Sequence, residues 1–376
     1  MKYERPTRAE INLSALRHNL QVVRKASGSA KVMGVVKAEA YGHGLIQIAR
    51  ELTELGVDYL AVSFLEEGVS LREAGIKTPI LVMGGLVDEQ INYYLDYDLD
   101  ITVSSVWKGL HVEQIAAKRG ITASVHLKFD TGMGRIGQHW ETADILFRKL
   151  SDKKHLDIKG IYTHFASADD EHREFSNLQL DRFREVLNTA RKYGINPPLI
   201  HAANSGAVLQ FPEKSCFTMV RPGLMLYGWA PSPELQELTN LVPVMTLKSR
   251  IVYVKKPPAG TTIGYGSTWV TPGDRWIATL PIGYGDGFPR RAGNCAFVNI
   301  KGRLCPIVGR VSMDQITIDA GEEAYLGDEV VLFGGKETNY LSIWDLSTAL
   351  DTIPYEIMCG LTSRVPRVYF YSEKPE

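Results

Sequence analysis

The segment KVMGVVKAEAYGHG, residues 31–44, changes character near its middle. Residues 31–36 are mostly apolar and rich in valine, which is typical of a buried strand. After the glycines at positions 42 and 44, residues 45–55 repeat apolar side chains at helical spacing. A buried strand followed by an amphipathic helix is the repeating unit of α/β folds. The segment therefore predicts one βα unit, with Lys37 at the end of its strand.

The same alternation continues from residue 8 to about residue 230. The predicted strands are AEIN (9–12), AKVMGVVKA (30–38), DYLAVSF (58–64), PILVMGG (79–85), LDITVSS (99–105), ASVHLKFD (123–130), IKGIYTHFA (158–166), LIHAAN (199–204) and FTMVRPGLMLYG (217–228). About eight such repeats favour a (β/α)8 barrel of the TIM type, which typically needs about 250 residues. An open doubly wound sheet is the structural alternative, but its first turn would be expected to carry a glycine fingerprint, which this sequence lacks.

The sequence changes texture in the proline-containing stretch 229–243. Beyond it, β-branched runs such as 245–256, 275–285, 295–303 and 313–320 alternate with glycine and proline turns. One helix is predicted at 342–351, with Ser342 as its N-cap. We therefore expect a barrel domain over residues 1–236 and a mainly β C-terminal domain over residues 237–376.

Composition limits the classes of partner. The chain has 376 residues, 44% of them hydrophobic and 23% charged, with a net charge of -1. This balance gives no electrostatic reason to expect nucleic acid or an anionic membrane, and no stretch is apolar enough to span a bilayer. The cysteines show no metal-ligand spacing and are expected to be reduced packing residues. We expect a cytoplasmic protein that binds small molecules and copies of itself, and no metal.

Reactive side chains close several of the predicted strands. They are Lys37, Lys128 with Asp130, His164, Asn204 with Ser205, and Arg221. Each alone has an ordinary structural explanation, such as a lysine lying along an apolar surface or a histidine hydrogen-bonded in the core. The carboxyl ends of barrel strands, however, form one face, which is where such barrels carry their active sites. The convergence therefore favours a catalytic site.

The chemistry of these residues is compatible with a pyridoxal phosphate site. Burial lowers the pKa of a lysine, which makes its amine available to attack the carbonyl of a sugar or of pyridoxal phosphate. Ser205, the backbone around Gly223 and the hydroxyl of Tyr41 could donate hydrogen bonds to a phosphate. The sequence IGYG also occurs twice, at 263–266 and 282–285, and its glycines would let the backbone approach another surface closely.

A series of motifs then extends over nearly the whole chain. They are VVKAEAYGHG (35–44), HLKFDTGMGRIG (126–137), YTHFASAD (162–169), HAANSGA (201–207), VRPGLMLYG (220–228), IGYGSTW (263–269), PIGYGDGFPR (281–290), GRVSMDQ (309–315) and IPYEIMC (353–359). This combination resembles bacterial alanine racemases. The resemblance implies a pyridoxal-phosphate-dependent barrel of fold type III followed by a β domain, interconverting L-alanine and D-alanine to supply peptidoglycan synthesis. It also implies a head-to-tail homodimer with shared active sites.

The resemblance assigns roles to individual residues. Two bases are implied: Lys37, which would also form the Schiff base with the cofactor, and Tyr265 from the other subunit. The implied cofactor-binding residues are Lys37, Tyr41, His164, Asn204, Ser205, Arg221, Gly223, Leu224 and Tyr355. Arg135 and the backbone of Met313 would bind the substrate carboxylate, and Lys128 matches a lysine that is often carbamylated.

These roles make physical sense. Racemisation needs a proton acceptor on one face of Cα and a donor on the other, which two opposed bases would supply. Arg221 would donate a hydrogen bond to the pyridine nitrogen without readily giving up its proton. Two positions depart from the common family pattern, Glu39 and Ser312. Neither is an implied base, although Glu39 could alter charge near the cofactor.

Three alternatives stay open on the sequence. An amino-acid decarboxylase of the same fold would usually build its β domain from both chain ends. A racemase of wider substrate range would differ only in pocket geometry. A non-catalytic cofactor-binding barrel would resemble the first domain alone, and residues 240–376 argue against it.

Overall fold

The computed structural model describes residues 5–321 and 324–372, which fold into two compact units. The barrel unit comprises Arg17–Ala40 and Leu45–Leu241. The β unit comprises the described parts of Met1–Leu16, Tyr41–Gly44 and Val242–Glu376. The chain therefore passes into the β unit at Tyr41 and returns to the barrel unit at Leu45, in the middle of the segment quoted first.

The barrel unit contains eight parallel strands in the order β10-β2-β3-β4-β5-β6-β8-β9. Their bounds are β2 (Lys31–Val35), β3 (Tyr59–Val62), β4 (Ile80–Val82), β5 (Asp100–Val103), β6 (Ala123–Asp130), β8 (Leu156–Tyr162), β9 (Leu199–His201) and β10 (Met219–Val220). The short β7 (Gln138–His139) pairs with the end of β6. Hydrogen bonds from Thr218 N–H to Ile200 O (3.1 Å) and from Arg221 N–H to Ala203 O (2.9 Å) join β9 to β10. The predicted (β/α)8 barrel is confirmed.

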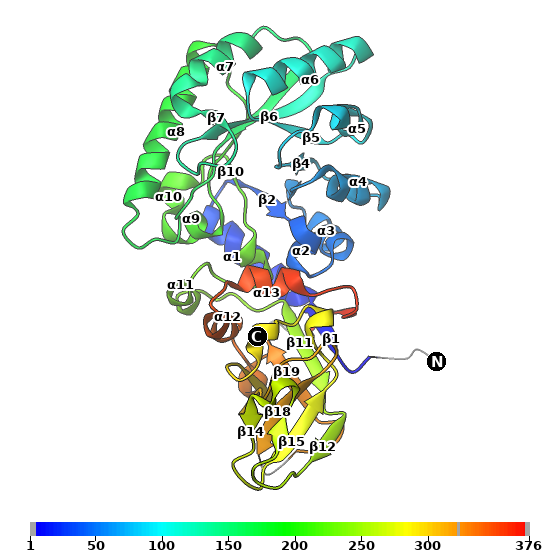
Figure 1. The fold of residues 1–376 in the computed structure, drawn as a ribbon. Helices are drawn as coiled ribbons and strands as arrows, with labels where there is room; N and C mark the ends of the chain where they lie inside the picture. The colour runs from blue at the N-terminus through cyan, green and yellow to red at the C-terminus, as the bar shows by residue number, and fades with distance from the viewer. Residues whose placement is uncertain (1–4, 322–323, 373–376) are drawn as a thin grey trace. The chain divides into compact units, whose positions relative to one another are not determined.

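Helices alternate with these strands and lie outside them (Figure 1). They are α1 (Leu13–Ser27), α3 (Leu45–Glu54), α4 (Leu65–Glu73), α5 (Ile91–Asp96), α6 (Val106–Arg119), α7 (Ala143–Leu150), α8 (Glu174–Lys192), α9 (Ser205–Gln210), α10 (Pro212–Ser215) and α11 (Pro233–Glu237). The short α2 (Lys37–Tyr41), between β2 and α3, is a turn with left-handed φ values. Helix α6 shows how sequence sets their limits. Ser105 caps its first turn by accepting from Lys108 N–H, and Gly120 ends it with a φ of 65°.

The prediction that residues 9–12 form a barrel strand is wrong. Strand β1 (Arg8–Asn12) pairs antiparallel with β11 (Met245–Arg250) and parallel with β20 (Arg367–Phe370) in the β unit. Its residues alternate between half-buried and buried, and its half-buried face carries Glu10, which forms ion pairs with Arg8 (2.6 Å) and Lys248 (3.0 Å). A strand with one charged face suits a sheet covered on one side, whereas barrel strands are buried on both.

The rest of the β unit is mainly strand, as predicted. The sheet that holds β1 has the order β17-β16-β19-β11-β1-β20, with β16 (Phe297–Ile300), β17 (Arg303–Pro306) and β19 (Glu329–Phe333). A second sheet contains β12 (Tyr253–Lys255), β15 (Trp276–Leu280) and β18 (Ile316–Gly321), and β13 (Thr262–Ile263) pairs with β14 (Trp269–Val270). Two helices follow, α12 (Ile343–Leu350) and α13 (Pro354–Gly360). Ser342 caps α12 by accepting from Trp344 N–H at 3.1 Å, which confirms the predicted cap.

Within the described ranges, no helix has both the length and the apolar character that crossing a membrane requires.

Candidate functional site

A cavity of about 290 Å³ opens in the barrel unit at the carboxyl ends of the strands. The side chains with chemical potential that line it are Lys37, Lys128, Arg135, Tyr162, His164 and Arg221. Among the described residues that line the cavity, none is a carboxylate. A cavity with four cationic side chains and no lining acid is suited to an anionic occupant.

The backbone that follows Lys37 is left-handed. Residues 38–41 have φ values of 53°, 55°, 52° and 55°, and none of them is glycine. This conformation typically costs about 1–2 kcal/mol per L-residue, and such residues occur mostly singly. Strained backbone of this kind persists only where the surrounding structure enforces it, and it concentrates at functional sites.

Hydrogen bonds within the barrel unit hold the start of this turn. Ala40 N–H donates to Val36 O at 2.9 Å, and Ala38 N–H donates to the carboxylate of Glu67 at 2.6 Å. The same carboxylate accepts from Ser63 N–H at 2.7 Å, at the end of the neighbouring strand. Glu67 thus ties two adjacent strand ends together and fixes the backbone from which the Lys37 side chain projects.

The glycines of the opening segment are required by packing inside the β unit. Gly42 and Gly44 have φ values of 81° and 100°. A Cβ at Gly42 would collide with the carbonyl of Met358, and a Cβ at Gly44 would collide with the hydroxyl of Tyr369. That hydroxyl donates to His43 O at 3.0 Å. Close contact with helix α13 at Gly42 and with strand β20 at Gly44 therefore explains why both positions are glycine.

Arg221 is buried at 3% exposure and donates to uncharged acceptors. Its Nη2 donates to Thr163 O at 2.7 Å and lies 3.2 Å from Nδ1 of His164, and its Nη1 donates to Nδ1 of His201 at 2.9 Å. Burial lowers the pKa of Arg221 to about 10. Burial, followed by the charge of Arg221, lowers the pKa of His164 well below its usual range, so His164 is neutral and accepts from the guanidinium.

Lys128 lies on β6 and is also buried. Its Nζ is 5.3 Å from the centre of the Tyr162 ring, and the guanidinium carbon of Arg221 is 5.2 Å from the same ring. Burial, together with the charges of Arg221 and Arg135, lowers the pKa of Lys128 to about 7. This lowered pKa makes the uncharged amine of Lys128 accessible near neutral pH.

A second group of implied residues gathers in the barrel unit at the start of α9. The side chain of Asn204 caps this helix by accepting from Ala207 N–H at 3.0 Å. The hydroxyl oxygen of Ser205 accepts from Gly223 N–H at 3.1 Å and from Met225 N–H at 3.2 Å. Ser205 and Gly223 are thus brought together with Leu224, which lies between Gly223 and Met225 in the sequence. The hydroxyl of Ser205 keeps its own proton to donate.

The remaining implied residues lie in the β unit. The rings of Tyr41 and Tyr355 are 5.9 Å apart, and burial, then the charge of Tyr355, raises the pKa of Tyr41. Tyr265 is 72% exposed, in a turn between Gly264 and Gly266 that needs a positive φ at both glycines. Met313 is 53% exposed. The structure therefore presents Tyr265 and Met313 at the surface of the β unit.

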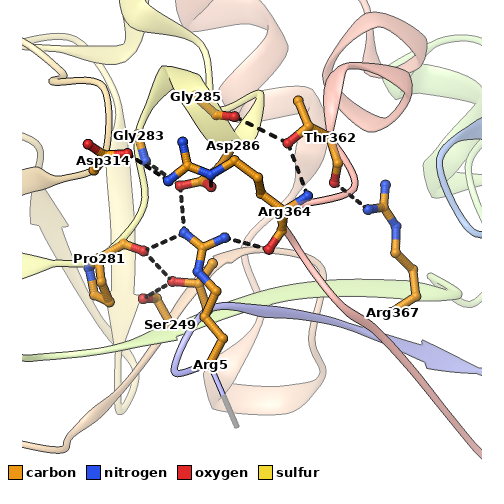
Figure 2. A network of polar contacts seen from close by, with 11 residues as sticks. Arg5, Ser249, Pro281, Gly283, Gly285, Asp286, Asp314, Thr362, Arg364 and Arg367 are labelled. Carbon is orange, nitrogen blue, oxygen red and sulfur yellow. Dashed lines mark hydrogen bonds and ion pairs between the residues drawn. The ribbon is translucent and has the colours of Figure 1, made fainter. Parts of the chain in front are cut away.

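An ion-pair network in the β unit includes Asp314, the residue that follows Met313 in the sequence (Figure 2). The carboxylate of Asp286 is buried between Arg5 (2.8 Å) and Arg364 (3.1 Å), and Arg364 also pairs with Asp314 at 2.6 Å. Gly285 N–H donates to Met313 O at 2.8 Å. The second IGYG segment therefore supports the turn that contains Met313.

Sequence reasoning missed several residues of the barrel site. The ring of Tyr162 lies near both Lys128 and Arg221, Thr163 accepts a hydrogen bond from Arg221 through its carbonyl, and Met225 contributes an N–H to the Ser205 group. The alternation of strand β8 could have indicated Tyr162, since it lies two residues before His164 and shares its face. A backbone donor such as Met225 N–H leaves no signal in the sequence.

A basic cavity with a lysine amine, at the carboxyl end of a parallel barrel, is typical of enzymes that act on small anionic molecules. Comparison with known proteins identifies the family to which this chain belongs. Residues 11–231 match the family described as alanine racemase, N-terminal domain, and residues 244–369 match alanine racemase, C-terminal domain. The chain therefore belongs to the alanine racemase family. It is an isomerase, an amino-acid racemase, which answers the choice between racemase and decarboxylase.

Individual alanine racemases match this chain over nearly its whole length. The alanine racemase of Halothermothrix orenii is 47% identical over 368 residues, covering 97% of both chains. The structure of alanine racemase from D-cycloserine-producing Streptomyces lavendulae has a TM-score of 0.93 and 36% identity, covering 99% of this chain and 98% of that one. The alanine racemase of Bartonella henselae, described with covalently bound pyridoxal phosphate, has a TM-score of 0.89 and 27% identity, covering 98% of this chain and 100% of that one.

Proposed function

We propose that this chain interconverts L-alanine and D-alanine with pyridoxal phosphate, in the cytoplasm, and so supplies D-alanine for peptidoglycan. The observation that carries the proposal is the convergence of Lys37, Lys128, Arg135 and Arg221 on one cavity lined by no described carboxylate. Both the cofactor, through its phosphate, and the substrate, through its carboxylate, are anions that such a cavity would bind. The names of the relatives support alanine as the substrate.

The donor set fits pyridoxal phosphate. Lys37 would hold the cofactor through its amine, Arg221 would face the ring nitrogen, and His164 would lie beside Arg221. Asn204, Ser205, Gly223 and Leu224, with Tyr41 and Tyr355, would surround the phosphate. When bound, the cofactor supplies an electron-accepting ring that acidifies the hydrogen on Cα of an amino acid. Arg221 limits this effect, because a guanidinium donates a hydrogen bond but holds its proton.

Proton transfer would use two bases on opposite faces of Cα. Lys37 would serve one face, and Tyr265 of a partner subunit the other. The exposure of Tyr265 and Met313 on the β unit supports this arrangement, because aromatic and apolar side chains left at a surface often mark an interface. The chain would then form a head-to-tail homodimer, in which Tyr265 and Met313 of each subunit complete the active site of its partner.

Arg135 and the backbone N–H of Met313 would bind the substrate carboxylate. Lys128 would support Arg135 as a carbamate. The ammonium of Lys128 would first lose one proton, and the uncharged amine would then attack carbon dioxide. The N–C bond would form as one C=O π bond breaks, with its electron pair going to oxygen. The nitrogen would release a second proton, so that a cation becomes an anion. The pKa of about 7 provides the reactive amine at neutral pH. The carbamate would also neutralise part of the positive charge that Arg135 and Arg221 bring to the cavity.

Exchange in D2O tests the proposal. Purified protein loaded with pyridoxal phosphate is incubated with L-alanine, and chiral chromatography with mass spectrometry follows the products. We expect deuterium at Cα and accumulation of D-alanine. Serine and lysine are run in parallel. If alanine kept its α-hydrogen and its configuration while serine or lysine was racemised, the assignment of alanine would be wrong.

A further inference from the structure

Four buried groups form a continuous hydrogen-bonded chain through the interior of the barrel. Asp100 is the first residue of β5, His126 lies in the middle of β6, His201 ends β9, and Arg221 follows β10. Asp100 Oδ2 is 3.1 Å from Nε2 of His126, whose Nδ1 is 2.9 Å from Nε2 of His201. Nδ1 of His201 is 2.9 Å from Nη1 of Arg221. Only Arg221 lines the cavity. His201 was described above only as an acceptor for Arg221, and Asp100 and His126 have no role in that site.

The two ends of this chain determine the direction of every hydrogen bond in it. A guanidinium only donates and an ionised carboxylate only accepts. Nδ1 of His201 must therefore accept from Arg221, which leaves the proton of His201 on Nε2. That proton is donated to Nδ1 of His126, whose own proton on Nε2 is donated to Asp100. Both histidines are then neutral, which agrees with the lowering of the His201 pKa by burial and by Arg221.

The surrounding residues hold both rings in these positions. His201 stacks on Tyr162 with ring centres 4.7 Å apart and an angle of 6° between the planes. Gly160 on β8 leaves the space that His126 occupies, because a Cβ there would collide with Nδ1 of His126. The glycine therefore accommodates the same nitrogen that accepts from His201. The hydroxyl of Tyr59 also hydrogen-bonds to Asp100 at the far end of the chain.

The hydrogen bonds from Asp100 through the two histidines explain how the buried positive charge of Arg221 is stabilised. The groups that accept its hydrogen bonds are two histidine rings and the carbonyls of Thr163 and Ala202, all uncharged. A buried cation without a countercharge is costly. Hydrogen bonds in series polarise one another, so a distant carboxylate can stabilise the cation through neutral rings. We propose that Asp100, His126 and His201 are positioning residues that form a relay, which orients Arg221 and stabilises its positive charge where it meets the ring nitrogen of the cofactor.

The last step of this inference, from Arg221 to the cofactor, rests on the proposed function. The relay itself does not, and it is tested first by locating its protons. Neutron diffraction from deuterium-exchanged crystals of the full-length protein shows deuterium directly. We expect deuterium on Nε2 and none on Nδ1 in both His126 and His201. His155 is the internal control, because its Nδ1 faces the carbonyl of Ile121 at 3.0 Å and must carry the deuterium. Deuterium on Nδ1 of His201, or on both nitrogens of either relay ring, would overturn the relay.

Two variants test what the relay does. Asp100→Asn removes the charge but keeps an oxygen that can accept from His126. His126→Asn keeps an acceptor for His201 but breaks the link to Asp100. The matched control is His155→Asn. We expect kcat for alanine to fall by about tenfold to a hundredfold in both relay variants, the range typical for residues that orient a ligand through another group, with KM changed by less than about twofold.

A spectroscopic readout separates the two levels of the inference. The protein is loaded with pyridoxal phosphate labelled with 15N in the ring, and the ring-nitrogen shift is measured by solid-state NMR. We expect the shift to move toward that of a free pyridine in Asp100→Asn and to stay unchanged in His155→Asn. If Arg221→Lys also left the shift unchanged, the placement of Arg221 at the ring nitrogen would be wrong. If Arg221→Lys moved the shift while Asp100→Asn changed neither the shift nor kcat, the relay proposal would fail. Asp100→Asn carries this test even if His126→Asn does not fold.

Discussion

The two units treat buried charge in opposite ways. In the barrel unit, Lys128 and Arg221 are buried around one cavity, and the hydrogen bonds of Arg221 go to neutral acceptors. In the β unit, the buried carboxylate of Asp286 is held between two arginines, Arg5 and Arg364. Paired charges need no ligand, whereas a concentration of one sign in a cavity is stabilised by an occupant of the opposite sign. The comparison distinguishes a cavity suited to an anionic occupant from a network of ion pairs that is complete without one.

The largest expected effect is on the barrel side. Lys37→Ala removes the amine proposed as cofactor anchor and as one base, so kcat for alanine should fall by about 10²–10⁴-fold or more, the usual contribution of a positioned acid or base. The absorbance of covalently held pyridoxal phosphate should also disappear. A chiral assay and an absorbance spectrum measure the two losses. A variant that kept both would contradict the role of Lys37.

Mixing subunits extends this test to the β unit. Tyr265→Phe should be inactive in at least one direction, because it removes the base proposed for the second face. If active sites are shared, a heterodimer of Lys37→Ala and Tyr265→Phe subunits contains one intact site, and activity should return on co-expression. Absence of recovery in a purified heterodimer would refute the shared site. Mixing Lys37→Ala with itself is the control.

A large effect on stability is expected in the β unit. Asp286→Asn leaves Arg5 and Arg364 around an uncharged side chain. Breaking a fully buried ion pair typically costs about 3–5 kcal/mol, and the partial exposure of both arginines makes the expected loss smaller than that. Urea unfolding of the purified protein measures the loss in free energy. Asp314→Asn is the matched control, because Asp314 is exposed and an exposed pair is worth about 0–1 kcal/mol. Equal losses in the two variants would contradict the comparison between buried and exposed pairs.

A pH effect of intermediate size is expected from Lys128. Its folded-state pKa of about 7 lies below the ordinary value of 10.5, so between these values the unfolded chain binds more protons than the folded chain. Stability should therefore rise with pH in this window, by up to about 1.4 kcal/mol per pH unit from this group. Unfolding of the cofactor-free protein at pH 7, 8 and 9, with carbon dioxide excluded, measures the slope. Lys128→Met should have a smaller slope, and parallel curves would rule out the shift.

The smallest effect is expected at Glu39. Its carboxylate accepts from Leu45 N–H at 3.3 Å, at the start of α3, and its side chain is exposed. An acidic group at a helix N-terminus typically contributes about 0.3–1 kcal/mol. Glu39→Gln should therefore destabilise the protein by that amount and leave kcat within about twofold. A larger loss of activity would indicate that Glu39 acts on the cofactor, as the sequence allowed.

Sequence reasoning could predict what depends on local pattern. The barrel, the lysine after its first strand and the cap at Ser342 all follow from periodicity and from residue chemistry near one position. The sheet that β1 joins could not be predicted, because the sequence of a five-residue strand does not indicate whether it pairs in the barrel or in the β unit. The Asp100 relay was missed for a similar reason. His126 and His201 are 75 positions apart, and only the closed barrel brings their rings together.

The left-handed turn after Lys37 was also invisible, since residues 38–41 include no glycine. Propensity favours a right-handed helix for such a sequence, and the structure imposes the opposite hand through contacts made elsewhere in the chain.

The passage of residues 41–44 into the β unit has a consequence for protein engineering. A chimera joined at residue 241 would combine the β unit of one parent with Tyr41, Gly42, His43 and Gly44 of the other. Gly42 and Gly44 fit closely against Met358 and Tyr369. In such a chimera, residues 41–44 of one parent would therefore have to fit the C-terminal segment of the other parent. A functional graft should therefore move three pieces together, residues 5–16, residues 41–44 and the chain from residue 242 onward. The residues that must be exchanged together are defined by their contacts in the folded protein, and they do not form one continuous stretch of sequence.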